Sequence, residues 1–312
     1  EWDWLISRQR DSGIPFPVWY CTECDHEVLA ERNQLPADPL SDDPPVDACP
    51  ECGHDAFRPE EDVLDTWATS SLTPLINADW DPETLGNGEL AAGDLANPEL
   101  YPFSIRPQAH DIISFWLFHT VVKCYEHTGE VPFESVLING HVLDRDRRKM
   151  SKSKGNGIDP REVMDEYPID AIRYWAASTS VGEVFPFNEN SMRQGEKLLQ
   201  KLWNASKLVD SLADTEPAEP DEFAAMDEWL LASLDDVIET VTAYFEAHEY
   251  AKARDELRAF FWHTFCDDYL EIAKQSEADS TPYTLRVAHR RFLKLFAPFV
   301  PHVTEELHTT LY

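Results

Sequence analysis

The spacing of the apolar residues changes near the middle of the chain, and the change predicts two kinds of structure. Before residue 159, apolar residues form short runs separated by Gly, Pro, Asn and Asp. Phe103–Arg106 and Ser135–Asn139 are predicted strands, and Asp111–His127 between them has the length of a buried helix. A strand, a helix and a strand in this order predict a βαβ unit with a parallel pair of strands.

After Asp159 the pattern becomes helical and stays so. Pro160 suits the first turn of a helix, and Asp159 suits its N-cap. Helices are predicted at Asp170–Ser178 and Asn190–Leu212, followed by a polar joint at Asp214–Asp221. Beyond the joint, three apolar stripes have helical spacing: Trp229, Leu230, Leu234, Ile238, Val241 and Phe245; Leu257, Phe261, Phe265, Tyr269 and Ile272; Leu285, Ala288, Phe292 and Phe296. Pro298 and Pro301 are predicted to end the last helix, so that residues 190–312 form a helix bundle with short connections.

The remaining segments are less regular. Residues 1–20 are aromatic and are predicted to form strand and turn, whereas residues 59–100 have turn signals at 81–82, 86–88 and 97–98. The longest apolar run, near Ile112–Val122, is too short to span a bilayer. The chain begins with Glu1 and has no signal-like apolar stretch, so we expect an internal piece of a larger soluble, cytoplasmic protein.

Four cysteines between residues 21 and 58 form two Cys-x-x-Cys pairs, Cys21 with Cys24 and Cys49 with Cys52. Paired knuckles of this kind predict a structural Zn²⁺ held by four thiolates, with no open position for catalysis. His26 and His54 are alternative ligands. Cys124 and Cys266 stand alone inside helical stretches and are predicted to be buried apolar residues.

The charge of the chain limits its partners. Asp and Glu total 59 against 26 Lys and Arg, a formal net charge of −33. Either the protein does not touch nucleic acid, or it works at very high salt, where a Debye length of about 3 Å screens both self-repulsion and attraction to phosphates. Because the acidic residues are spread along the whole chain, the composition favours a halophilic source.

One loop interrupts this acidity. Lys149-Met150-Ser151-Lys152-Ser153 follows a predicted strand and turn, and six basic residues lie between Arg145 and Lys154. Lysines supply point charge, and hydroxyls and backbone N–H groups supply hydrogen bonds, so the loop could wrap a polyphosphate. Mobile cations that close on a leaving pyrophosphate would stabilise its developing charge. The alternative is a solvated, flexible basic loop.

The pentapeptide at 149–153 is identical to the second signature of the class I aminoacyl-tRNA synthetases, and the resemblance extends over nearly the whole chain. The segments WLISRQR, DVLDTWATSS and QAHDIISFW resemble the catalytic domain of class Ia members, HVLDRDRRKMSKSKGN resembles their adenylate site, and FPFNENSMRQGEKLLQKLWNAS resembles the start of their anticodon-binding helices. The chain resembles the archaeal valyl branch most and lacks the Gln-His-Arg-Gly-Trp of isoleucyl enzymes. It departs from the valyl pattern at Asp11-Ser12 and at Gly157.

The resemblance implies roles for individual positions. Lys149 and Lys152 would be catalytic, and the ATP site would comprise Gly140, His141, Lys149, Met150, Ser151, Lys152 and Ser153. The amino-acid pocket would comprise Asp65, Trp67, Asp111, Ile112 and Trp116. Plain core packing is the alternative for Ile112 and Trp116, and a helix N-cap is the alternative for Asp65.

The resemblance also implies an architecture and an activity. Residues 1–20 and 59–188 would be the C-terminal half of a Rossmann-like α/β catalytic domain, 21–58 a zinc-ribbon insertion, and 189–312 a truncated, all-α anticodon-binding domain. Because no His-x-Gly-His element is present, we expect a fragment without the N-terminal half and the editing domain, inactive alone. The parent would be monomeric and would use ATP and Mg²⁺ to activate valine and load it onto tRNA(Val). The alternatives are an isoleucyl enzyme, a non-catalytic module that binds zinc and tRNA, and a zinc-ribbon interaction protein without RNA.

Overall fold

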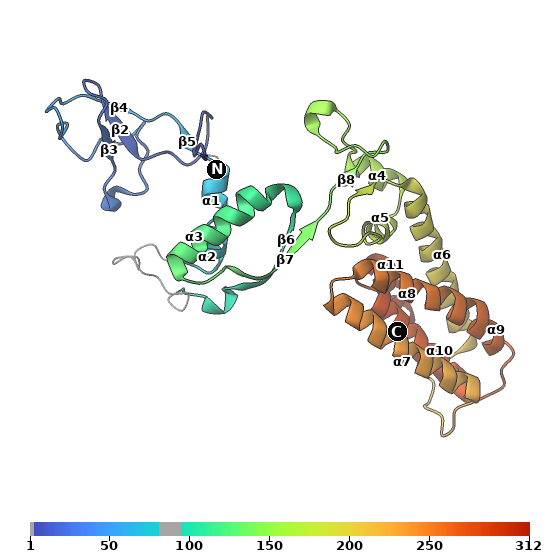
Figure 1. Cartoon of the computed structure of the whole chain (residues 1–312). Helices are drawn as coiled ribbons and strands as arrows, with labels where there is room; N and C mark the ends of the chain where they lie inside the picture. The colour runs from blue at the N-terminus through green and yellow to red at the C-terminus, as the bar shows by residue number, and fades with distance from the viewer. Residues whose placement is uncertain (1–2, 81–94) are drawn as a thin grey trace. The chain divides into compact units, whose positions relative to one another are not determined.

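The computed structural model of the chain describes residues 3–80 and 95–312 and comprises two compact units, Glu1–Leu137 and Ile138–Tyr312 (Figure 1). Two of the expected turn signals, at 81–82 and 86–88, lie outside the described residues. None of the helices within 3–80 and 95–312 is both long enough and apolar enough to cross a membrane.

The first unit begins with small antiparallel sheets. Strand β1 (Ser7–Arg8) pairs with β5 (Val63–Leu64), so that residues 1–20 and the segment after residue 59 meet. Between them a separate sheet has the order β3-β2-β4. Its strands are β2 (Val18–Cys21), β3 (Glu27–Leu29) and β4 (Phe57–Pro59). Trp19, Val28 and Ala37 form the small core of this sheet and bring the two ends of the cysteine segment together.

The predicted strand–helix–strand unit is present. Strands β6 (Phe103–Ala109) and β7 (Phe133–Asn139) are hydrogen-bonded neighbours in one sheet. The predicted helix Asp111–His127 is correct in extent, but only α3 (Phe118–Thr128) is α-helical. It is preceded by a 3-10 turn at His110–Ile112 and a π-helical turn at Ile113–Leu117. Cys124 on α3 is buried against α2 (Thr73–Asn77), which confirms its prediction.

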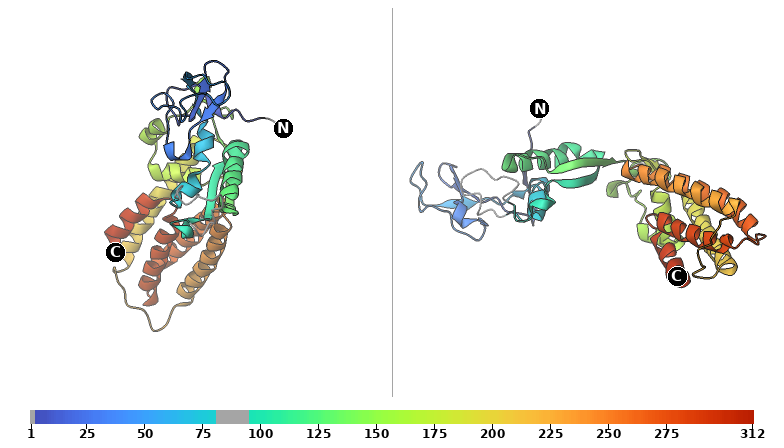
Figure 2. Two further views of the ribbon diagram at one scale, coloured as in Figure 1. Left: turned by 90° about the vertical axis from the view of Figure 1, so that its left-hand side faces the viewer. Right: turned by 90° about the horizontal axis from the view of Figure 1, so that it is seen from below.

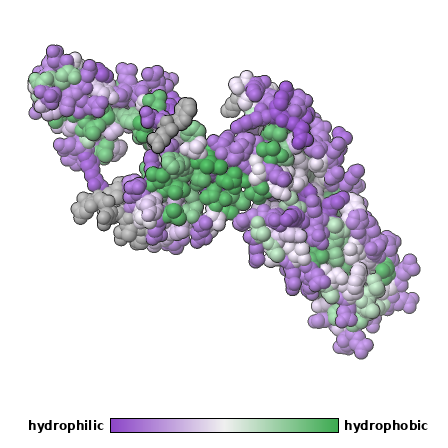
Figure 3. Space-filling view, in the orientation of Figure 1, coloured by the Kyte–Doolittle hydropathy of each residue, from purple (hydrophilic) through white to green (hydrophobic). Residues whose placement is uncertain are grey.

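This unit exposes apolar side chains on the surface. Figure 3 shows hydrophobic residues gathered over the region of α3, β6 and β7. The exposed large apolar residues of these elements and the π-helical turn are Ile105, Ile113, Phe115, Phe118, Val122, Tyr125 and Val136. A two-stranded sheet has marginal stability by itself, and a contiguous apolar patch is typical of a surface that packs against other polypeptide.

The second unit begins with a parallel pair, β8 (Val142–Leu143) and β9 (Phe185–Pro186). Between them lie α4 (Pro160–Glu166) and α5 (Ile169–Ala176). The predicted N-cap of α4 is confirmed, because the Asp159 carboxylate accepts the Arg161 N–H at 2.9 Å. A buried cluster that includes Trp175 and Phe187 joins these elements to α6 (Glu189–Leu212).

The rest of the second unit is the predicted helix bundle (Figure 2). Its helices are α7 (Ala225–Glu246), α8 (Tyr250–Ala259), α9 (Leu270–Ala273), α10 (Ser280–Phe296) and α11 (Pro301–Leu311). A π-helical stretch, Phe260–Tyr269, connects α8 to α9 without a break. Helix α10 packs against α6, α7 and α11, and its side chains Leu285, Phe292 and Phe296 are fully buried.

Most of the three predicted stripes lie in this core, with three corrections. Trp229 and Ile272 are 43% and 42% exposed, because they lie on the solvent side of their helices. Pro298 follows the end of α10 as predicted, but Pro301 begins α11 rather than ending a helix. The joint is confirmed by the gap between α6 and α7, and Cys266 is buried as expected.

Candidate functional site

The lysine–serine loop is a short hairpin that follows β8. The Leu143 and Lys149 backbones form an antiparallel bridge, and the Arg148 carbonyl accepts the Asp144 N–H at 2.8 Å. Arg147, at the turn, has φ of 63°. Lys152–Lys154 form a single 3-10 turn, and Gly155 then reverses the chain with φ of 61°. The sequence-predicted residues Lys149–Ser153 therefore occupy the end of a folded hairpin, not a featureless loop.

Two polar side chains hold the base of this hairpin. Asn156 donates through Nδ2 to Asp144 Oδ2 at 2.7 Å and to the Lys149 carbonyl at 3.1 Å. Its Oδ1 accepts the Ser151 N–H at 2.9 Å. The buried Asp144 carboxylate also accepts the N–H groups of Asp146 and Arg148 at 2.9 and 2.8 Å. The Arg148 N–H and then the Asn156 amide hold the pKa of Asp144 below its ordinary value, so the carboxylate stays ionised.

The hydroxyl groups lie close together within the hairpin. Ser151 Oγ and Ser153 Oγ are 3.3 Å apart, and the Lys154 N–H donates to Ser151 Oγ at 3.3 Å. Ser153 and Lys154 are exposed, whereas Met150 is half-buried. Hydroxyl and backbone donors of this kind can bind phosphate oxygens.

Gly140 and His141 precede the loop on the way into β8. A Cβ built on Gly140 would lie 1.9 Å from the Glu183 carbonyl oxygen, so the glycine permits close approach of two backbones. The His141 carbonyl accepts the Phe185 N–H at 3.1 Å in the β8–β9 pairing. This contact explains the glycine by packing alone, and the ATP contact of both residues stays a prediction.

Of the predicted amino-acid pocket residues, Asp65 has the clearest environment. It is 3% exposed and accepts the Trp67 N–H at 3.3 Å, so the alternative reading as the N-cap of α1 (Thr66–Ser70) is confirmed. It also accepts from Trp4 Nε1 at 2.9 Å and pairs with Arg8 at 2.6 Å. Burial disfavours its charge, but the hydrogen bonds and arginines outweigh burial and lower the pKa of Asp65.

Trp116 is packed inside the first unit. It is 5% exposed, and its Nε1 donates to the Ser70 carbonyl at 3.2 Å. The Arg106 guanidinium lies 3.6 Å from its ring centroid and the Phe133 ring 5.8 Å away. Core packing therefore accounts for Trp116, while half-buried Trp67 and Ile112 and exposed Asp111 remain accessible. A valine pocket at these positions stays a prediction.

The four cysteines converge as their spacing predicted. All four Sγ atoms lie within 4.8 Å of one another, with Cys21–Cys52 at 3.5 Å and Cys24–Cys49 at 3.6 Å. Four thiolates around one Zn²⁺ at about 2.3 Å would be about 3.8 Å apart, so the cluster fits a tetrahedral ion. Within the described residues, the cluster contains neither His26 nor His54.

Two equivalent knuckles produce this convergence. The carbonyls of Cys21 and Cys49 accept the N–H groups of Asp25 and Gly53, which have φ of 57° and 77°. Burial raises the pKa of the Cys49 thiol, but N–H groups of Cys52 and Glu51 outweigh burial and hold it at about 7. The His26 N–H lowers the pKa of Cys24, but hydrogen bonding with the neighbouring thiols and burial outweigh it and raise that pKa to about 12, so within the cluster the first and second pairs each combine one more acidic and one less acidic thiol.

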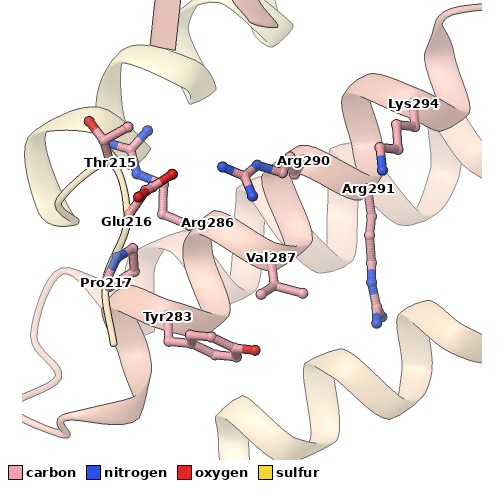
Figure 4. Close-up of a pocket in the computed structure, with 9 residues that line it drawn as sticks. All are labelled: Thr215, Glu216, Pro217, Tyr283, Arg286, Val287, Arg290, Arg291 and Lys294. Carbon is pink, nitrogen blue, oxygen red and sulfur yellow. The ribbon is translucent and has the colours of Figure 1, made fainter. Parts of the chain in front are cut away.

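A basic hollow of about 360 Å³ lies on the helix bundle, between α10 and residues 215–217 (Figure 4). Arg286, Arg290 and Lys294 stand four residues apart on α10 and share one stripe, which the sequence analysis missed. Arg286 is 4% exposed and pairs with Asp210 at 2.8 Å. Figure 4 shows the Arg290 guanidinium pointing along the hollow, and it lies 4.4 Å from the Tyr312 ring centroid.

Comparison with known proteins gives the class first. Residues 1–187 match the family of class I tRNA synthetases (I, L, M and V), and residues 227–312 match the anticodon-binding domain of tRNA ligase. The chain therefore belongs to the class I tRNA synthetases, which confirms the resemblance found in the sequence.

The particular relatives are valine–tRNA ligases. The enzyme of Haloarcula marismortui is 67% identical over 100% of this chain and 35% of its own length. That of Methanopyrus kandleri is 39% identical over 100% of this chain and 34% of its own. This chain thus spans about a third of the length of these relatives. The solved ternary complex of Agrobacterium radiobacter LeuRS with tRNA and LeuAMS has the same fold, with a TM-score of 0.70, 24% identity, and coverage of 97% of this chain and 40% of that one.

Proposed function

We propose that this chain is part of a valine–tRNA ligase, which uses ATP to activate valine and then loads it onto tRNA(Val). The observation that carries the proposal is 67% identity along the whole chain to a valine–tRNA ligase. The folded hairpin at 149–153 adds chemical support, since a module that only binds zinc and RNA has no use for a pyrophosphate site.

The reaction has two steps. A carboxylate oxygen of valine attacks the α-phosphorus of ATP, a new P–O bond forms, and the bond to pyrophosphate breaks. The 2′-hydroxyl of the terminal adenosine of the tRNA then attacks the carbonyl carbon and releases AMP. In the first step negative charge grows on pyrophosphate, and fixed or closing cations lower the barrier where that charge develops.

In this proposal Lys149 and Lys152 supply the positive charge, and Ser151 and Ser153 donate hydrogen bonds to phosphate oxygens. Met150 lies beside the adenine, and Gly140 and His141 contact ATP. Mg²⁺ accompanies ATP as its counter-ion. Of the predicted pocket residues in the first unit, the accessible Trp67, Asp111 and Ile112 contact valine, while Asp65 caps α1 and Trp116 packs in the core.

The proposed architecture assigns each segment a task. Residues 1–20 and 59–188 form the C-terminal half of a Rossmann-like catalytic domain, and the exposed apolar face of α3, β6 and β7 supports packing against further polypeptide. Residues 21–58 hold one structural Zn²⁺ through Cys21, Cys24, Cys49 and Cys52, whose four sulfurs leave no position for a substrate. Residues 189–312 bind tRNA, and the basic stripe on α10 is a candidate contact for its phosphates.

The acidic composition is consistent with this assignment at high salt. Halophilic enzymes can carry a large negative charge because molar salt screens the repulsion between their charges over a distance of about 3 Å. The Haloarcula relative supports such an environment. We further propose a cytoplasmic, monomeric enzyme.

Two experiments test the proposal. The 312-residue chain should bind tRNA(Val) in molar KCl in preference to tRNA(Ile), and a preference for tRNA(Ile) would favour an isoleucyl enzyme. The same chain should show no valine-dependent ATP–pyrophosphate exchange, because it holds no His-x-Gly-His element. Clear exchange by the chain alone would refute the proposal that the active site also needs a His-x-Gly-His element, which this chain does not contain.

A further inference from the structure

The lysine–serine hairpin depends on a side-chain bridge that ties its two ends together. Asn156 makes three hydrogen bonds. They connect Asp144, directly after β8, to two backbone groups of the loop, the Lys149 carbonyl and the Ser151 N–H. The Asp144 side chain completes the bridge, because it also accepts the Arg148 N–H at 2.8 Å.

We propose that Asp144 and Asn156 are positioning residues that hold the lysine–serine hairpin in the orientation needed to meet the phosphates of ATP. The proposal rests on the proposed function of the hairpin. Neither residue needs to touch ATP, since each acts through the backbone that carries Lys149 and Ser151.

The chemistry of the bridge requires an amide at position 156. Its Nδ2 donates to a carboxylate and a carbonyl, while its Oδ1 accepts an N–H, so both halves of the amide are used. Asp144 is fixed in turn by two backbone N–H groups and by Arg148 Nε at 3.2 Å. A satisfied polar network anchored on the buried Asp144 carboxylate favours one geometry, and small misplacements of reacting groups cost up to about 100-fold in rate.

An isosteric substitution at position 156 tests the hydrogen bonds of the bridge without changing the size of the side chain. Asn156→Asp keeps the shape but places a second carboxylate where 2.7 Å now separates Asn156 Nδ2 from Asp144 Oδ2. Two carboxylates at that distance share one proton, which raises the pKa of the pair. The variant should therefore lose the bridge at neutral pH and regain it in acid, when one carboxyl donates to the other. The exchanged pair Asp144→Asn with Asn156→Asp restores a donor and an acceptor and should recover part of the order.

The first test is amide hydrogen exchange of the 312-residue chain in molar KCl, with rates corrected for intrinsic pH dependence. Asn156→Ala and Asn156→Asp should exchange the Ser151 amide roughly tenfold faster or more, which corresponds to losing about one hydrogen bond. The exposed, matched variant Asn204→Ala should not change that rate. Unchanged protection in Asn156→Ala, or no acid recovery in Asn156→Asp, would overturn the bridge.

The second test measures catalysis in the Haloarcula enzyme with this chain in place of its matching third. Asn156→Ala should lower kcat for valine-dependent exchange roughly 10- to 100-fold, with a smaller change in KM for ATP, and the exchanged pair should recover part of kcat. A loosened hairpin with unchanged kcat would refute the positioning role. An inactive parent chimera would refute the proposed function instead, and hydrogen exchange would still decide the bridge.

Discussion

Gly140→Ala changes one hydrogen into a methyl group at the glycine of the second unit whose Cβ would meet its neighbours most closely. The new Cβ would lie 1.9 Å from the Glu183 oxygen, 2.3 Å from its carbon and 2.7 Å from the Val184 nitrogen. All three are backbone atoms, so no side chain can rotate away and β8 must move from residues 183–184 by about 1 Å or more.

The loss in the free energy of unfolding can be estimated from the contacts that this movement breaks. The β8–β9 pairing contains the Phe185 N–H to His141 carbonyl bond at 3.1 Å and the Phe187 N–H to Leu143 carbonyl bond at 2.8 Å. Each bond contributes about 1 kcal/mol, and loosened packing of Val142 and Phe185 adds a similar amount, giving about 2–4 kcal/mol in total.

Urea unfolding of the chain in molar KCl measures this cost. Gly157→Ala is the matched control, because nothing lies within 4 Å of its Cβ and it should change stability by less than about 0.5 kcal/mol. If Gly140→Ala proved as stable as Gly157→Ala, the close backbone contact would be wrong, and the role of Gly140 would lie with ATP alone.

Three further predictions concern other parts of the chain. Cys49→Ser should lower the bound zinc, measured by metal analysis, from about one ion per chain and should unfold the segment 21–58. Cys266→Ala should keep the zinc, so equal zinc contents in the two variants would contradict the four-thiolate site. The double variant Arg290→Gln/Lys294→Gln should weaken tRNA binding, and the slope of the log of the binding constant against log salt should become shallower by about one per lost phosphate contact. Lys274→Gln removes a lysine that is paired with Glu271 and should leave tRNA binding unchanged. Burial, reinforced by Arg286, lowers the pKa of His289 to about 4. Because an unfolded histidine titrates near pH 6.5, the free energy of unfolding should fall by up to about 1.4 kcal/mol per pH unit as the pH is lowered from about 6.5 to 4. His289→Gln should remove this contribution to the slope. If His289→Gln had the same pH dependence as the exposed control His308→Gln, the assignment would be refuted.

Local rules predicted much of the structure. The cysteine cluster follows from two Cys-x-x-Cys knuckles, because each sets its own turn and the small sheet needs only to bring them together. The bundle follows from apolar spacing, since residues such as Leu234 and Phe292 must be buried for helices to pack.

Features that depend on distant contacts were not predictable. Apolar spacing does not report a slip in helical hydrogen bonding, so the π-helical turns at Ile113–Leu117 and Phe260–Tyr269 were missed. Asn156 stands between two glycines and indicates only a turn in the sequence. Its bridge to Asp144 exists because the hairpin folds back, although an Asn in such a turn is a known signal of side-chain to backbone bonding.

The role of the lysine–serine hairpin in activating valine is tested most directly by ATP–pyrophosphate exchange in the Haloarcula enzyme in which this chain replaces its matching third. We expect exchange that depends on valine, exceeds that with isoleucine, and falls by about 100-fold or more in Lys149→Ala with Lys152→Ala. Exchange that is unaffected by removing both lysines, or that prefers isoleucine, would contradict this expectation.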